Sequence, residues 1–209
     1  MIDEAQLEEE LLPLAFEHRV AFAASCCERL LPNYRAFSLM EGWGDYLFLR
    51  GALDEVWSWL AGGRPSESNV RGAAERCAEL APDTEEFASL FVSAAGDAAA
   101  AVAYTLECCL DGEAARAATV GRLAAESVYM YLLTVNDPLT DAHASDPAFE
   151  QAMESAPLMR AEVGKQRADL DRLKSLRVLN SETLSGLRES SARSGIRPLE
   201  RGLVANRTP

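Results

Sequence analysis

Cysteine thiols are the side chains of this sequence best suited to redox or metal chemistry. Five are present: two adjacent pairs, Cys26 with Cys27 and Cys108 with Cys109, and a single Cys77. Neighbouring residues of a helix point about 100° apart, so each pair can direct only one thiol toward a shared centre, such as one formed by Cys27, Cys77 and Cys109. Unpaired Cys is also among the residue types most often buried. We therefore expect free thiols that fill the core, with no metal site and no cofactor.

The two histidines give little support for catalysis or metal binding. His18 and His143 lie far apart in the sequence, and neither belongs to an HExxH motif or to a set of ligands with zinc spacing. His18 precedes Cys26 by eight residues, which places their Cβ atoms about 12 Å apart on a helix. That distance is too long for a nucleophile and its base. We expect a half-exposed His18 and a chain without catalytic residues.

The carboxylates indicate more about a possible binding site than the cysteines and histidines do. Asp97 stands among small residues, where burying a charge is costly without a partner. It either bridges to an Arg on a neighbouring helix or faces a ligand, in a pocket that Glu28, Tyr34 and Asp45 would also line. We favour the bridge. The pocket would instead belong to a small-molecule receptor or an enzyme.

The distribution of charge favours a basic protein partner. The chain has 33 acidic and 20 basic residues and a formal net charge of -13, which disfavours binding to nucleic acid and to anionic membranes. No Lys or Arg occurs between Arg76 and Arg116 or between Arg122 and Arg160. The second gap contains a turn-rich loop, residues 136–147, whose candidate binding residues are Asp141, His143 and Asp146. Alternatively, the acidic surface only keeps the protein soluble, or it neutralises a basic toxin.

Two features predict a cytoplasmic protein. The opening residues, MIDEAQLEEELL, are acidic where a secretory signal would need a basic segment and an apolar run. The longest apolar stretch, residues 88–110, is rich in Ala and is interrupted by Asp97 and Glu107. We therefore expect it to be a core helix and no membrane span.

Apolar residues recur at helical spacing over most of the sequence, and the alternating β-branched runs of strands are missing. This pattern predicts an all-α fold, a compact bundle of about seven or eight helices. The first long helix is expected over residues 13–32, with Pro32 ending it or starting the next. Asp45 can cap a further helix, and Pro82 with Asp83 opens one that should reach residue 110.

The later part of the chain is expected to continue the bundle. A turn at Asp111-Gly112 precedes a helix over residues 113–135, and Pro147 and Pro157 each start another. The helix after Pro157 should be amphipathic with a charged outer face. Residues 181–209 lose the apolar periodicity, so we assign residues 1–180 to one helical domain and residues 181–209 to a partly disordered or docking tail.

The run AFAASCCERLLPNYRAFSLMEGWGD, followed by LDEVWSWL, resembles the YjaG-like bacterial family, domain of unknown function 416. The residues that carry the resemblance are Cys27, Glu28, Arg29, Pro32, Tyr34, Phe37, Gly42, Gly44, Asp45, Trp57 and Leu60. It covers roughly residues 10–177 and implies a helical protein. It supplies no catalytic residue, and a suggested link to histidine-kinase signalling rests on gene neighbourhood.

These observations predict a non-enzymatic binding or regulatory protein that recognises a protein partner and could form a homo-oligomer. The candidate binding residues outside the turn-rich loop are Glu28, Arg29, Tyr34, Trp43, Asp45, Trp57 and Asp97. Glu28 and Arg29 are adjacent and point different ways on a helix, so each needs its own partner. The Gly residues around Trp43 and the cap at Asp45 suit either a structural corner or a binding site.

Overall fold

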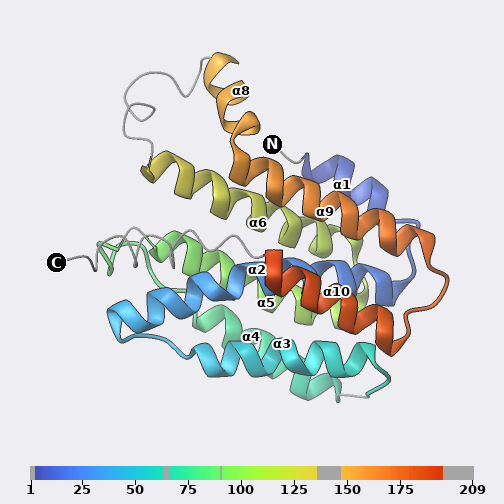
Figure 1. Ribbon diagram of the computed structural model, residues 1–209. Coiled ribbons are helices and arrows are strands. Elements are labelled where there is room, and N and C mark those ends of the chain that lie inside the picture. The colour runs from blue at the N-terminus through green and yellow to red at the C-terminus, as the bar shows by residue number, and fades with distance from the viewer. Residues whose placement is uncertain (1–2, 64–65, 90, 136–146, 195–209) are drawn as a thin grey trace.

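The chain folds as a bundle of helices. The computed structural model describes residues 3–63, 66–89, 91–135 and 147–194, and these ranges contain nine helices and no strand. The helices are α1 (Glu4–Leu11), α2 (Phe16–Glu41), α3 (Tyr46–Leu60), α4 (Glu67–Glu79), α5 (Val92–Asp111), α6 (Ala114–Val135), α8 (Pro147–Ser155), α9 (Pro157–Ser175) and α10 (Ser181–Ser194). The predicted all-α bundle is confirmed, and the described residues hold slightly more helices than expected (Figure 1).

Helix α2 forms the centre of the bundle. It packs against α3, α5, α6, α9 and α10, and all its side chains over residues 20–31 are buried. Figure 1 shows α6 and α9 on one side of α2 and α3 and α4 on the other. The main core extends from Leu7 of α1 to Leu187 of α10, and a smaller apolar cluster joins α6, α8 and α9. None of the described helices is both long and apolar enough to cross a membrane.

Pro32 does not end a helix, contrary to the prediction. Helix α2 continues through it and ends at Gly42, whose φ of 64° is left-handed. Proline has no N–H to donate to the Glu28 carbonyl four residues earlier, which costs a helix about 3 kcal/mol. Burial of apolar residues on both sides, such as Leu31 and Phe37, outweighs this cost.

The helix predicted over residues 82–110 begins only with α5. Asp83 instead stabilises a single turn, in which its carboxylate accepts the N–H two residues later at 2.8 Å. Phe87 explains the difference, because its ring packs edge-on against Phe37 and Trp43 with centroid distances of 5.2 and 5.4 Å. These contacts hold the segment against the α2–α3 corner and outweigh the local helical signal.

The segment after residue 180 is helical where the structure describes it. Helix α10 packs on α2 and buries Leu184 and Leu187. The domain boundary predicted after residue 180 therefore falls between α10 and the helix on which it packs. Its sequence is dominated by Ser and charged residues, which is why its periodicity was too weak to predict a helix. Residues 195–209 lie outside the described residues.

Asp45 caps α3 as predicted, since its Oδ1 accepts the N–H of Phe48 at 2.9 Å. Replacing Asp45 with Ala should lower the free energy of unfolding by about 1 kcal/mol, because the first turn loses this hydrogen bond. Asp45→Asn should retain most of the stability, and Glu55→Ala, on the exposed face of α3, should change it by less than about 0.5 kcal/mol. Urea denaturation followed by circular dichroism measures all three. Wild-type stability in Asp45→Ala would contradict the capping role.

Candidate functional site

The five cysteines are free thiols inside the bundle. Four are buried, and Cys109 is partly buried. Burial raises the pKa of the Cys26, Cys77 and Cys108 thiols to about 12 and also raises the pKa of Cys27 and Cys109. The thiolate is the nucleophile and metal ligand, so these side chains act as apolar packing groups, and the predicted place of the free thiols in the core is confirmed. In the described part of the chain, no group of three or more His, Cys, Asp or Glu is arranged to hold a metal ion.

His18 is more buried than predicted. It is 4% exposed, and its Nε2 lies 3.2 Å from the carbonyl oxygen of Leu176. The predicted half-exposed position is wrong because the end of α9 covers the start of α2. The other histidine, His143, lies with Asp141 and Asp146 in residues 136–146, outside the described residues.

Glu28 is bonded to side chains from two other helices. Its carboxylate, in a residue only 5% exposed, accepts two hydrogen bonds from the Arg50 guanidinium, at 2.7 and 2.9 Å, and one from the Trp57 indole at 2.8 Å. Arg188 of α10 approaches the same carboxylate to 3.0 Å, and Asp54 pairs with both arginines. We call these five residues the Glu28 cluster. It joins α2, α3 and α10, and it brings together two predicted candidates, Glu28 and Trp57.

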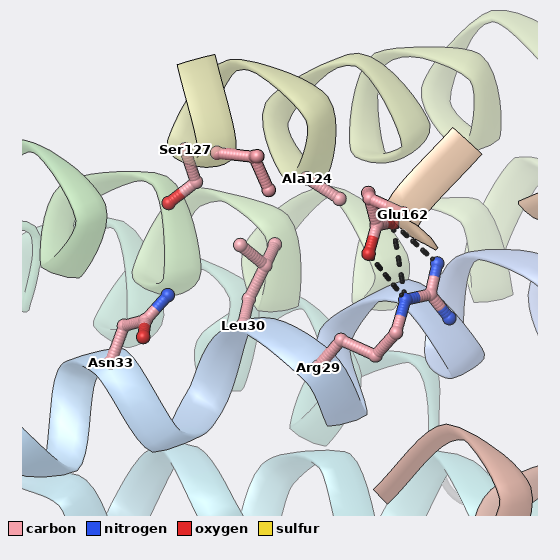
Figure 2. Close-up of a pocket in the computed structure, with 7 residues that line it drawn as sticks. Arg29, Leu30, Asn33, Ala124, Ser127 and Glu162 are labelled. Atoms are coloured by element: carbon pink, nitrogen blue, oxygen red, sulfur yellow. Dashed lines mark hydrogen bonds and ion pairs between the residues drawn. The ribbon is translucent and has the colours of Figure 1, made fainter. Parts of the chain in front are cut away.

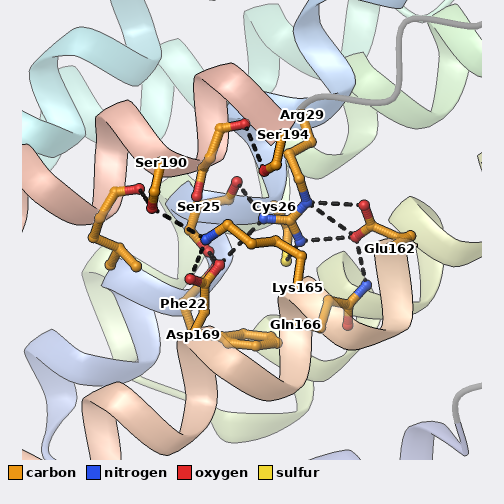
Figure 3. A network of polar contacts seen from close by, with 12 residues as sticks. Phe22, Ser25, Cys26, Arg29, Glu162, Lys165, Gln166, Asp169, Ser190 and Ser194 are labelled. Carbon is orange, nitrogen blue, oxygen red and sulfur yellow. Dashed lines mark hydrogen bonds and ion pairs between the residues drawn. The ribbon is translucent and has the colours of Figure 1, made fainter. Parts of the chain in front are cut away.

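Arg29 points to the other side of α2, toward α9, so the prediction of separate partners is confirmed (Figure 3). Its Nε and Nη2 donate to the two oxygens of Glu162 at 2.8 and 2.7 Å, and its Nη1 lies 3.3 Å from Asp169. Burial alone lowers the pKa of Arg29, but the Glu162 carboxylate outweighs it and the net shift is upward. Burial alone raises the pKa of Glu162, and Arg29 likewise reverses that shift. The ion pair therefore stays charged although it is buried.

Three further side chains complete this Arg29 network. Gln166 donates to Glu162 at 2.8 Å and to a backbone carbonyl of α6 at 2.9 Å. Ser25 donates to Asp169 at 3.2 Å, and Lys165 forms an ion pair with the same carboxylate. Figure 3 shows the network bridging α2 and α9. Its formal charges balance, with two cations and two carboxylates, so it holds the helices together and offers no net charge to a ligand.

The sequence prediction missed three of these residues by assigning them to a charged outer face of α9. Glu162, Gln166 and Asp169 are in fact buried, with exposures of 2%, 2% and 3%. Their spacing of four and three residues is helical and places them on one stripe with the buried Met159 and Leu173. This shared stripe was the available signal that polar residues of α9 face the core.

Tyr34 and Trp43 have structural positions at the α2–α3 corner. The Tyr34 hydroxyl donates to the Leu80 carbonyl at 3.0 Å, and burial raises its pKa. Trp43 packs edge-on against Phe37 with a centroid distance of 6.1 Å. Gly44, at φ 82°, passes so close to Tyr34 that a Cβ there would lie 2.2 Å from the hydroxyl oxygen. These contacts give Tyr34 and Trp43 a structural role at the corner.

Asp97 forms none of the ion pairs found among the described residues, so the favoured bridge to an Arg is not observed. Arg122, which lies near it on α6, is paired with Glu4 and Glu126 instead. Burial raises the pKa of Asp97 to about 7. The neighbouring Glu126 carboxylate contributes to this rise, and a hydrogen bond with Ser127 opposes it. Asp97 is therefore a carboxyl group that changes its protonation near neutral pH.

A cavity of about 10 Å³ lies between α2, α6 and α9 (Figure 2). Asn33 and Ser127 line it and are 5% and 3% exposed, and Asn33 Oδ1 has no hydrogen-bond partner among the described residues. Figure 2 shows Asn33 and Leu30 on α2 and Ser127 on the helix opposite. The volume accommodates about one water molecule, so this cavity is too small for a substrate.

The predicted pocket lined by Glu28, Tyr34, Asp45 and Asp97 does not form as one site. Glu28 faces α3 and α10, whereas Asp97 lies beside α6. Tyr34 lies next to the turn that contains Asp45, whose own carboxylate caps α3. The structure thus divides these residues among three environments, of which the Glu28 cluster contains the most charged side chains.

Comparisons with known proteins identify the family. Residues 6–199 match the family model described as "Protein of unknown function (DUF416)". The chain is 28% identical over 162 residues to the uncharacterized protein YjaG of Escherichia coli strain K12. This alignment covers 76% of this chain and 82% of that protein. The same identity and coverages hold for YjaG of Salmonella typhimurium strain LT2. The crystal structure of a DUF416 family protein from Shewanella baltica OS155 has the same fold, with a TM-score of 0.82, 23% identity, and coverage of 92% of this chain and 96% of that one. The match continues past residue 177, the predicted limit of the resemblance, and includes α10. This chain belongs to the DUF416 family of proteins of unknown function.

Proposed function

We propose that this protein is a non-enzymatic binding protein of the bacterial cytoplasm that recognises a basic segment of a protein partner. A formal net charge of -13 steers basic molecules toward it and repels nucleic acids. The Arg29 network and the Glu28 cluster support a binding role, because their charged groups neutralise one another between helices. Five free thiols are typical of a reducing compartment, which supports the cytoplasmic location.

The observation that carries this proposal is a surface at the α2–α3 corner where exposed apolar and acidic side chains occur together. We call it the corner surface, and its residues are Leu39, Met40, Leu47, Asp83, Glu85 and Glu86. Leu39 and Leu47 are 74% and 78% exposed. Figure 1 shows the end of α2 and the start of α3 at the same end of the bundle. Phe87 ties the acidic turn to this end through its contacts with Phe37 and Trp43.

The charges of this surface are available to a partner. Glu79, at the end of α4, pairs with Arg76, whereas Asp83, Glu85 and Glu86 form no ion pair with any described residue. Exposed apolar residues can serve as anchors that a partner buries, and acidic residues around them can pair with Lys or Arg. An amphipathic basic helix satisfies both requirements, and a basic toxin is one protein that could supply it.

Site-specific cross-linking tests the proposal. A photoreactive amino acid at Leu39 should cross-link, in cells of the native host, to a protein with a basic amphipathic segment. Charge reversal in a Glu85→Lys/Glu86→Lys variant should remove this cross-link, because like charges would then face each other. The affinity of the purified complex should also fall about tenfold or more as the salt concentration rises from low to physiological values and beyond.

The matched control is Asp171→Lys/Glu182→Lys, which makes the same change in net charge at exposed positions of α9 and α10. It should leave the cross-link in place, and both double variants should keep wild-type thermal stability. Equal cross-linking in the two double variants would assign the effect to total charge and would contradict the corner surface as the contact. Absence of any cross-link at both Leu39 and Leu47 would contradict the proposal as a whole.

A further inference from the structure

Arginines line a cavity at a second region of the surface, in contrast to the acidic corner surface. A cavity of about 180 Å³ lies between α2, α3 and α10. Its lining includes Glu28, Pro32, Arg35, Tyr46 and Arg50. The volume is below the roughly 300–1,000 Å³ of pockets for drug-sized ligands, so it suits a small ion or a small metabolite.

Arg50 lines this cavity and has one N–H without an acceptor in the described part of the chain. Its Nη atoms bond to Glu28 and Asp54, but its Nε is buried and has no hydrogen-bond acceptor among the described residues. Burial alone lowers the pKa of Arg50, yet the Glu28 and Asp54 carboxylates together outweigh it, so the guanidinium remains a cation. An unsatisfied, buried N–H on a charged group is costly, and an acceptor on a ligand would remove that cost.

Arg35 supplies a second cation at the same cavity. It is exposed and forms no ion pair with any described residue. Its guanidinium lies over the Tyr46 ring, 5.8 Å from the centroid. This cation–π contact restrains the side chain at the cavity wall without neutralising its charge.

The carboxylate in the wall does not cancel these cations. Glu28 already accepts from Arg50, Arg188 and Trp57. Together with Arg35, the Glu28 cluster has three arginines against two carboxylates, a local formal charge of +1. In a chain with a net charge of -13, this local excess of positive charge favours an anion in the cavity over a cation.

We propose that the cavity between α2, α3 and α10 binds a small oxyanion, the carboxylate or phosphate group of a small molecule, through Arg35 and Arg50. Arginine guanidinium groups match the planar or forked geometry of such groups. The site is distinct from the corner surface and does not depend on a protein partner. Carboxylate and phosphate ligands share this chemistry, so the experiment has one arm for each.

The test is a titration of the purified full-length chain with sodium phosphate and, separately, with sodium acetate, each compared with sodium chloride at equal ionic strength. At least one oxyanion should raise the Tm in a saturable way that chloride does not reproduce, because a ligand that binds only the folded state stabilises it. Isothermal titration calorimetry with the same anions gives the Kd. The anion that binds more tightly identifies the ligand class.

Two variants make the result specific. Arg35→Gln should weaken binding by about tenfold or more and remain folded, since Arg35 is exposed and forms no ion pair with a described residue. The control, Arg160→Gln, removes an exposed arginine of α9 and should bind as the wild type does. General salt effects on stability would be equal in all three proteins. The proposal is overturned if neither anion exceeds chloride, or if Arg35→Gln and Arg160→Gln respond alike.

Discussion

Replacing Arg29 with Met should lower the free energy of unfolding by about 3–5 kcal/mol, the largest effect expected of any single substitution considered for this protein. The Glu162 and Asp169 carboxylates would remain at the α2–α9 interface without the guanidinium that now neutralises them. Both residues are nearly fully buried, so water cannot replace Arg29 as their partner. Urea denaturation followed by circular dichroism measures the loss.

An exposed arginine provides the control. Arg71 pairs with Glu67 across one turn of α4, and both side chains are more than half exposed. Arg71→Met makes the same chemical change and should cost less than about 0.5 kcal/mol. If Arg29→Met were as mild as Arg71→Met, the Arg29 network would not be a structural element of the bundle.

The same network also predicts a strong coupling between its members. The triple variant Arg29→Met/Glu162→Met/Asp169→Leu should recover most of the stability that Arg29→Met loses, because apolar side chains of similar volume replace the three buried charges and only the partly exposed Lys165 remains. Recovery would show that the loss in Arg29→Met comes from uncompensated carboxylates. A triple variant less stable than Arg29→Met would instead show that the polar contacts specify how α9 docks on α2.

Features that depend on local chemistry could be predicted from the sequence. The cap at Asp45 needs only a carboxylate near the N–H groups of the next turn, and Gly112 only the left-handed conformation that ends α5. The different directions of Glu28 and Arg29 follow from helix geometry alone. These predictions were correct because no distant residue decides them.

Features decided by distant residues could not be predicted. Pro32 lies inside α2 because residues on both sides of it are buried by other helices of the bundle, which no local pattern reports. The late start of α5 depends on Phe87 contacting Phe37, fifty residues earlier. Of the candidate site, sequence reasoning named Glu28 and Trp57 but neither Arg50 nor Arg188, because the cluster forms only when α3 and α10 both dock on α2.

Asp97 should make the stability of the folded chain depend on pH, in a direction that follows from the shift of its pKa. Burial raises this pKa from 3.8 to about 7. Between these two values the folded chain retains a proton that the unfolded chain has lost, so stability falls as pH rises from about 4 to 7 and is constant above that. The shift sets an upper limit of about 4 kcal/mol on the penalty, and partial exposure of Asp97 reduces it to about 2 kcal/mol.

Asp97→Asn should therefore stabilise the protein at pH 8 by about 2 kcal/mol, a rise in Tm of roughly 4–8 °C, and should have little effect at pH 4.5. The amide has the same shape but does not ionise, so the variant also loses the decline of Tm between these pH values. Asp171→Asn, at an exposed position of α9, should show neither effect. Differential scanning calorimetry at several pH values measures both variants. A lower Tm for Asp97→Asn at pH 8 would mean that the ionised carboxylate has a stabilising partner. The ligand-facing role of Asp97 would then replace the interpretation of a partly buried acid that forms no ion pair with a described residue.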